Sequence, residues 1–312
     1  MDPLDEVNPP TGAAGKGAAA RRGPEPGLPA TPDGLTVSVA TEEDWNHVIA
    51  WADGERWNVG RGDAALFLPT DPAGFFVGRM EGRPVSAMSV VNYSARYAFL
   101  GHYLVDPAFR GRGLGLATWQ AAVPHARGRS LGLDATPARQ DDYAKSGFVA
   151  YYDTVRHTGR PQRAGAPGPG TVPVTGEHLA AVLAYDRQYF PTDRADFVQR
   201  WLTAPGHVAY ARLTEGRLTG YGVIRPASEA HRIGPLFAET RADAEALFDA
   251  LTAHLGPGDE VSLDIPAPQK EAGALAIDRG LAAEFHTVRM YSGPVPANRA
   301  EQAFATTTLE LG

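Results

Sequence analysis

The sequence predicts an α/β fold of the α+β kind, built twice, in which each half carries a mixed, mostly antiparallel, twisted sheet flanked by helices. Short apolar runs of strand length alternate with longer amphipathic segments of helical period. The order of these segments is repeated in the second half of the chain. With 312 residues, of which 43% are hydrophobic, the chain can form two ordinary domains or one large one.

The first half shows the pattern most clearly. Runs rich in β-branched and aromatic residues predict strands, and apolar residues spaced three or four apart predict helices. In chain order we expect a strand at 35–40, helices at 41–57 and 61–68, strands at 74–80, 85–94 and 97–106, a helix at 114–126, a strand at 130–136, a helix at 138–147 and a strand at 148–157. This order predicts an antiparallel meander that becomes a β-α-β unit after residue 105.

An internal repeat accounts for the second half. Several short matches recur in the same order at a nearly constant offset, which indicates a duplication. The matches are Glu81-Gly82-Arg83 with Glu215-Gly216-Arg217 (215 − 81 = 134), Gly101 with Gly234 (133), Asp134 with Asp264 (130), and Thr154-Val155-Arg156 with Thr287-Val288-Arg289 (133). Because Asp264 and Arg289 have counterparts of the same residue type in the first copy, we expect them to be structural.

Composition divides the chain further. Residues 1–34 contain almost no large apolar side chains and predict a disordered tail. The Pro- and Gly-rich residues 159–173 predict a linker. The two predicted domains are therefore 35–158 and 174–312.

Bulk properties exclude several classes of function. A net charge of −7 argues against nucleic-acid binding. The absence of cysteine excludes disulfides, thiolate zinc sites and a cysteine nucleophile. No His, Asp and Glu cluster has metal-ligand spacing, so no metal is expected. With neither a run of about 18 apolar residues nor a signal peptide, we expect no membrane segment and a cytoplasmic protein.

The turn after residue 105 predicts a binding site for a phosphorylated ligand. Three glycines alternate with two arginines directly before a helix: Arg110, Gly111, Arg112, Gly113 and Gly115. Glycine permits positive φ, and backbone N–H groups at a helix N-terminus bind phosphate oxygens. Neither a Walker A loop nor a dinucleotide fingerprint fits this sequence. The second copy has "AETRADAEALF" here, without glycine.

The stretch "YLVDPAFRGRGLGLATWQ" resembles the pyrophosphate loop of the GNAT acetyltransferase superfamily, in which R-x-x-G-x-G follows a strand ending in V-x-P. The later "YAKSGF" is similar to a second segment of that superfamily. The resemblance covers roughly residues 35–158 and implies tandem GNAT folds with a degenerate second copy. It implies acetyl-CoA as co-substrate, with the backbone of the turn on the pyrophosphate and the strand edge on the pantetheine; the expected contacts are Leu104, Val105, Arg110, Gly111, Arg112, Gly113, Leu114 and Gly115.

The resemblance also implies that Tyr143 protonates the departing thiolate; the alternative is that it only packs helix against sheet. No base is evident on the strand before Val105, because Tyr103 and the residues at even spacing before it are poor bases. His102 has the opposite parity and is expected to be a core or surface histidine. For the acceptor site we expect Tyr103, Asp186 and Arg187, although the latter two also suit the solvated face of an ordinary helix.

The sequence therefore predicts an N-acetyltransferase that transfers an acetyl group from acetyl-CoA to the primary amine of a small molecule by direct attack. Two alternatives remain at this point: a non-catalytic acyl-CoA-binding sensor and a tandem acetyltransferase like mycothiol synthase. The second copy could replace a dimer partner, so a monomer is expected, with a homodimer as the alternative.

Overall fold

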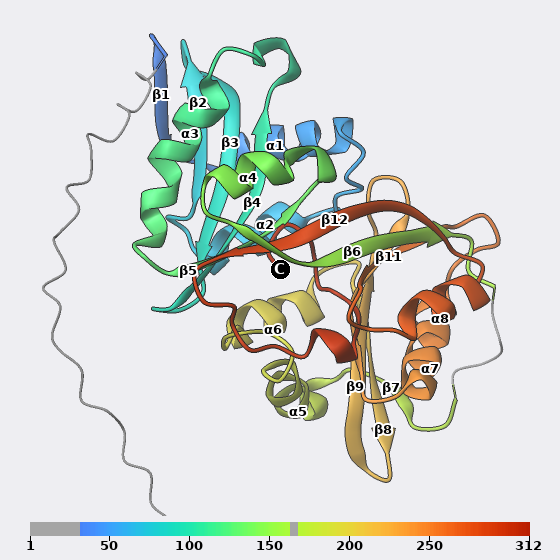
Figure 1. The fold of residues 1–312 in the computed structure, drawn as a ribbon. Coiled ribbons are helices and arrows are strands. Elements are labelled where there is room, and N and C mark those ends of the chain that lie inside the picture. The colour runs from blue at the N-terminus through green and yellow to red at the C-terminus, as the bar shows by residue number, and fades with distance from the viewer. Residues whose placement is uncertain (1–31, 163–167) are drawn as a thin grey trace, which may run out of the picture. The chain divides into compact units, whose positions relative to one another are not determined.

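The strands of the computed structural model form one continuous sheet (Figure 1). The structure describes residues 32–162 and 168–312, so most of the predicted tail lies outside the described residues. The strands are β1 Leu35–Val39, β2 Phe75–Met80, β3 Arg83–Asn92, β4 Tyr97–Val105, β5 Ser130–Ala135, β6 Val149–Gly159, β7 Thr171–Pro173, β8 Val208–Thr214, β9 Arg217–Arg225, β10 His231–Ala238, β11 Val261–Pro266, β12 Ala282–Ser292 and β13 Ala303–Ala305. Strand β7 begins inside the segment predicted as a linker and pairs with β8.

The α-helices are α1 Glu42–Gly54, α2 Asp63–Phe67, α3 Leu114–Ala122, α4 Gln140–Lys145, α5 Gly176–Asp186, α6 Ala195–Thr203, α7 Arg241–Thr252 and α8 Ala272–Asp278. Helix α1 starts at a capping box in which Thr41 and Asp44 exchange hydrogen bonds. The helix predicted at 114–126 changes to a 3₁₀ turn after Ala122, because Pro124 lacks the N–H group that an α-helix needs there. The predicted elements of the first half are otherwise confirmed, with ends shifted by one to three residues.

Both halves contain the predicted β-α-β unit. Strand β4 is parallel to β5, and in the second half β10 is parallel to β11, while β2, β3 and β4 form an antiparallel meander. The predicted mixed, mostly antiparallel sheet flanked by helices is therefore confirmed.

The last strand of each half crosses into the other half. Strand β12 pairs with β5 of the first half, β6 pairs with β11 of the second, and the two exchanged strands pair with each other (Figure 1). Thr154 faces Thr287, its own counterpart in the repeat (287 − 154 = 133). An approximate two-fold axis therefore passes between these residues, and the sequence did not predict this exchange.

Reciprocal ion pairs fasten the exchanged strands. Arg156 of β6 donates to Asp264 of β11 over 2.7 and 3.0 Å, and Arg289 of β12 donates to Asp134 of β5 over 2.9 and 2.8 Å. Each bidentate pair joins an arginine of one copy to an aspartate of the other. This explains why both residue types recur, and it agrees with the structural role expected for them.

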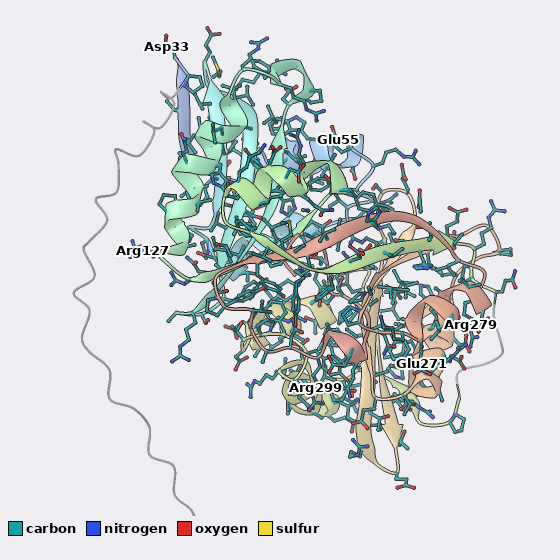
Figure 2. All side chains as sticks on the ribbon, viewed as in Figure 1. Asp33, Glu55, Arg127, Glu271, Arg279 and Arg299 are labelled. Atoms are coloured by element: carbon teal, nitrogen blue, oxygen red, sulfur yellow. The ribbon has the colours of Figure 1, made fainter. Side chains whose placement is uncertain are left out.

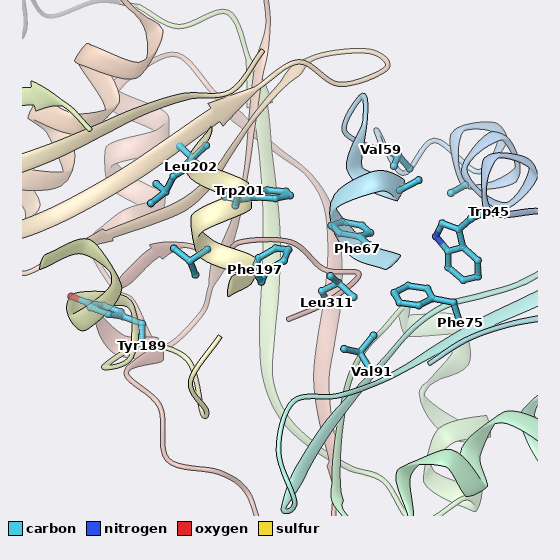
Figure 3. Close-up of a cluster of buried hydrophobic side chains, with 14 of the residues drawn as sticks. Trp45, Val59, Phe67, Phe75, Val91, Tyr189, Phe197, Trp201, Leu202 and Leu311 are labelled. Atoms are coloured by element: carbon cyan, nitrogen blue, oxygen red, sulfur yellow. The ribbon is translucent and has the colours of Figure 1, made fainter. Parts of the chain in front are cut away.

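A shared core joins the halves. The side chains of β3 alternate between two cores: Ala87 and Val91 face a cluster with Trp45, whereas Met88 faces a cluster with α3. The first cluster continues into α5 and α6 of the second half, and Figure 3 shows Phe67, Phe197, Trp201 and Leu311 meeting there. Charged residues such as Asp33 and Arg127 lie at the periphery in Figure 2.

Candidate active site

A cavity of about 710 Å³ opens where β4 and β5 separate. The two strands pair only from Tyr97 to Leu100 of β4, so no strand of the described residues lies beside the β5-facing edge of Gly101–Val105. Residues from β4, the glycine turn, α3, α4 and β5 line this space. The unpaired strand edge offers backbone N–H and C=O groups to an extended ligand.

The glycine turn forms one wall of the cavity. Gly111 and Gly113 have φ of +77° and +76°, the left-handed conformation that favours glycine, and Gly113 is the N-cap of α3. No described side chain caps this helix, so its first N–H groups remain available to a ligand. Gly115 packs against the strand, because a Cβ there would lie 3.1 Å from both Tyr103 Oη and Val105 Cγ2.

The two arginines of the turn differ. Arg110 lines the cavity, donates to the Val105 carbonyl oxygen over 3.1 Å and forms an ion pair with Glu55. The Arg112 guanidinium instead lies 5.0 Å from the centre of the Phe109 ring and donates to the Ala108 carbonyl oxygen. Of the two side chains, only that of Arg110 is placed to face a ligand in the cavity.

In the second half, the corresponding strand edge is covered. Leu236 and Phe237 of β10 pair with Ala305 and Ala303 of β13, at the positions that follow Gly234 as Tyr103 and Leu104 follow Gly101. The chain's own strand thus occupies the edge that remains open in the first half. The absence of glycines in the second copy agrees with this covered edge.

The rings of Tyr103, Trp119 and Tyr143 lie close together in the cavity lining. Tyr143 of α4 lies with its ring centre 6.5 Å from that of Tyr103 and 5.7 Å from that of Trp119. Burial raises the pKa of the Tyr103 phenol to about 12 and raises that of Tyr143 as well, so both are protonated at neutral pH. The structure brings these predicted residues together with the glycine turn.

The structure does not bring Asp186 and Arg187 to this cavity. Asp186 is buried, and its carboxylate accepts hydrogen bonds from Arg194 and from the Tyr221 hydroxyl. Arg187 forms an ion pair of 2.9 Å with the exposed Asp193. The Asp186 carboxylate serves the packing of α5 on α6, and neither residue lines the cavity.

Two lining residues were not expected at the site. His102 is 1% exposed and adopts a φ of +48°, at a point where the β3–β4 register shifts. Its ring packs against Trp45 and Phe67 of the shared core, as expected of a core histidine, although the bulge breaks the strand alternation and His102 also lines the cavity. Glu310 belongs to residues 306–312, which lie outside the repeat, so no pattern in the sequence pointed to it.

Comparison with known proteins identifies the family. Residues 39–148 match the acetyltransferase (GNAT) family, and residues 182–305 match an acetyltransferase (GNAT) domain. The holothin acyltransferase of Pseudoalteromonas sp. (strain SANK 73390) is 34% identical over 280 residues, which cover 89% of this chain and 94% of that protein. The chain belongs to the GNAT acetyltransferase superfamily. It is therefore an acyltransferase with tandem GNAT domains.

Solved structures agree with this GNAT fold. A protein from Pyrococcus horikoshii aligns with a TM-score of 0.75 at 20% identity, over 93% of this chain and all of that one. A tandem GNAT protein from the clavulanic acid biosynthesis pathway aligns with a TM-score of 0.60 at 19% identity, over 84% of this chain and 99% of that one. Within the described residues, no helix is long and apolar enough to cross a membrane.

Proposed function

We propose that the chain is an acetyl-CoA-dependent N-acetyltransferase that transfers the acetyl group to the primary amine of a small molecule by direct attack. The observation that supports this most is the open edge of β4 next to the glycine turn, with Tyr143 in the same cavity. The holothin acyltransferase relative makes holothin the first acceptor to test.

The residues present fit acetyl-CoA. The N–H groups of Arg112, Gly113, Leu114 and Gly115 would hold the pyrophosphate at the start of α3, where the helix dipole favours negative charge. Arg110 would add a charged donor. Leu104 and Val105 would bind the pantetheine amides as a neighbouring strand would, because the β5-facing edge of β4 is unpaired there.

Direct attack then requires one proton acceptor and one proton donor. The amine nitrogen forms a bond to the thioester carbonyl carbon, the carbon–sulfur bond breaks, and the electron pair leaves with sulfur. The amine loses one proton to a base, and Tyr143 gives one proton to the thiolate. Since burial keeps the Tyr143 phenol protonated, it is suited to the donor role.

Calorimetric titration of acetyl-CoA tests the binding site. We expect one-to-one binding to the wild type and none to Gly113→Glu, which places a carboxylate at the phosphate position. The matched control is Gly82→Glu, where the φ of +80° imposes similar strain in open space away from the cavity. No binding to the wild type, or equal binding to Gly113→Glu, would contradict the proposed site.

Release of CoA tests the reaction. With holothin and a panel of primary amines, we expect the wild type to release CoA and Tyr143→Phe to do so about 100-fold more slowly with unchanged acetyl-CoA affinity. Binding of acetyl-CoA without release of CoA for any amine would favour the sensor alternative instead.

A further inference from the structure

Three buried polar atoms of residues that line the cavity lack a partner among the described residues: Thr287 Oγ1, His102 Nε2 and Glu310 Oε2. The last two belong to residues that are 1% and 3% exposed. Both residues line the cavity that contains the glycine turn and Tyr143. A buried polar group without a partner costs free energy, and such a group in a cavity points to a ligand that completes its hydrogen bonds.

The chain holds these two residues next to each other. Glu310 passes over Gly101, where a Cβ would lie only 3.0 Å from the Glu310 carbonyl carbon. Leu311 anchors the same segment in the core shared by both halves (Figure 3), and Tyr93 donates a hydrogen bond of 2.9 Å to the Leu311 carbonyl oxygen. Glu310 is therefore fixed in the first-half site although it comes from the end of the second half.

Each residue is fixed in its orientation. The His102 ring lies between Trp45 and Phe67, with ring centres 5.1 and 5.7 Å away, and its Nδ1 lies 3.3 Å from Ser89 Oγ. The Glu310 Oε1 accepts a hydrogen bond of 3.1 Å from Arg232. His102 Nδ1 and Glu310 Oε1 thus have partners, whereas His102 Nε2 and Glu310 Oε2 have none among the described residues.

Both groups are unprotonated at neutral pH. Burial lowers the pKa of His102 to about 4, although the charges of Glu310 and Asp63 act in the opposite direction. Burial alone would raise the pKa of Glu310, but the charges of Arg232, His102 and Arg156 together bring it to about 2. At neutral pH the cavity therefore presents a neutral imidazole beside a carboxylate.

We propose that His102 and Glu310 receive the amine of the acyl acceptor, with His102 Nε2 taking its proton and Glu310 stabilising the imidazolium that forms. This assignment rests on the function proposed above. Nδ1 keeps its hydrogen and donates it to Ser89 Oγ, so that the Nε2 lone pair faces the amine. The proton leaves nitrogen as the nitrogen–carbon bond forms, while Tyr143 supplies the proton for sulfur.

The same surroundings define the class of acceptor. The charged side chains beside this pair are already neutralised, Arg156 by Asp264 and Asp134 by Arg289. Trp57, Phe285 and Leu309 provide apolar lining. The acceptor is therefore an amine on an otherwise uncharged, largely apolar body, and a second charge on it would lose hydration without gaining a partner.

Steady-state kinetics on the full chain tests the assignment, with holothin and benzylamine as acceptors. Glu310→Gln and His102→Asn each should lower kcat/KM about 100-fold, and acetyl-CoA affinity should stay within about 3-fold of wild type. Asparagine tolerates the positive φ of residue 102, so this variant tests the idea even where Glu310→Gln fails to fold. Glu301→Gln removes the same charge from an exposed residue nine positions earlier in the chain and should act as wild type.

Three further readouts separate catalysis from structure. The double variant should be no slower than His102→Asn alone, because residues that act as a unit are not additive. Glu310→Asp should recover part of the loss. Phenylalanine, which adds a carboxylate to a benzylamine-like body, should be acetylated at least 10-fold less efficiently than benzylamine.

The outcomes distinguish this assignment from the proposed function. If the wild type turns over an amine and both variants stay within 3-fold of it, the assignment to His102 and Glu310 is overturned and the N-acetyltransferase stands. If the wild type binds acetyl-CoA but turns over neither amine, the proposed function is overturned, and this assignment with it.

Discussion

Replacing Gly101 by alanine tests whether residues 306–312 position the active site. A Cβ at residue 101 would overlap the carbonyl oxygen of Glu310 and lie 3.0 Å from its carbonyl carbon and 3.1 Å from Ser89 Oγ. Ordinary contacts to a Cβ begin at 3.4 Å, and two of these atoms belong to backbone. The segment that carries Glu310 must therefore move away from β4.

The size of the effect follows from overpacking. An added methyl group in a packed interior typically costs about 1–3 kcal/mol. For a domain of this size, each kcal/mol lowers Tm by roughly 2–4 °C, so Gly101→Ala should melt roughly 2–12 °C below wild type. Because Glu310 moves with the segment, kcat/KM for the amine should fall by more than the loss of folded protein explains.

Differential scanning calorimetry and CoA release measure these two effects. Gly273→Ala is the matched control, since a Cβ there meets nothing within 4 Å and alanine favours helix α8. A Gly101→Ala variant that melts within 1 °C of wild type with full activity would refute the close packing of Glu310 on β4.

Two further predictions concern buried charge. Arg289→Met leaves Asp134 buried without its partner and should lower the free energy of unfolding, measured by urea unfolding, by about 3–5 kcal/mol. Adding Asp134→Leu should restore most of this loss. Equal stability of the single and double variants would contradict this prediction. His102 has its pKa lowered in the folded state, from 6.5 to about 4. The contribution of His102 to the free energy of unfolding is therefore complete above pH 6.5 and falls by about 3 kcal/mol between pH 6.5 and 4. Urea unfolding of His102→Asn should show a smaller loss of unfolding free energy over that pH range. A loss equal to that of the wild type would exclude His102 as its cause.

Local signals made much of the first-half fold predictable from sequence. Periodicity places strands and helices within a few residues, and the contrast between the two copies singles out the turn at Gly111 and Gly113. Both glycines adopt the left-handed conformation for which glycine was expected there. The reciprocal use of Arg156 and Arg289 was not predictable, because a repeat shows which residues recur but not which copy of a strand pairs with which.

The acceptor end of the site depends on two long-range features that a sequence pattern does not contain. A bulge at His102 breaks the alternation of an ideal strand, and His102 is among the residues that line the cavity. Glu310 arrives from a segment more than 200 residues away along the chain, and only the folded register brings it to Gly101. For Asp186 the sequence pattern was misleading. Its charge suggested a binding residue, but its carboxylate already accepts hydrogen bonds from Arg194 and Tyr221.

The second half contributes to the first-half site although its own turn contains no glycine. Its β12 supplies the neighbour of β5, and its last residues supply Glu310. Neither contribution depends on glycines at the start of α7, because β13 covers the strand edge that a ligand would need. Substitutions in that turn therefore leave the strand exchange unchanged, whereas changes in β12 or residues 306–312 act directly on the remaining active site.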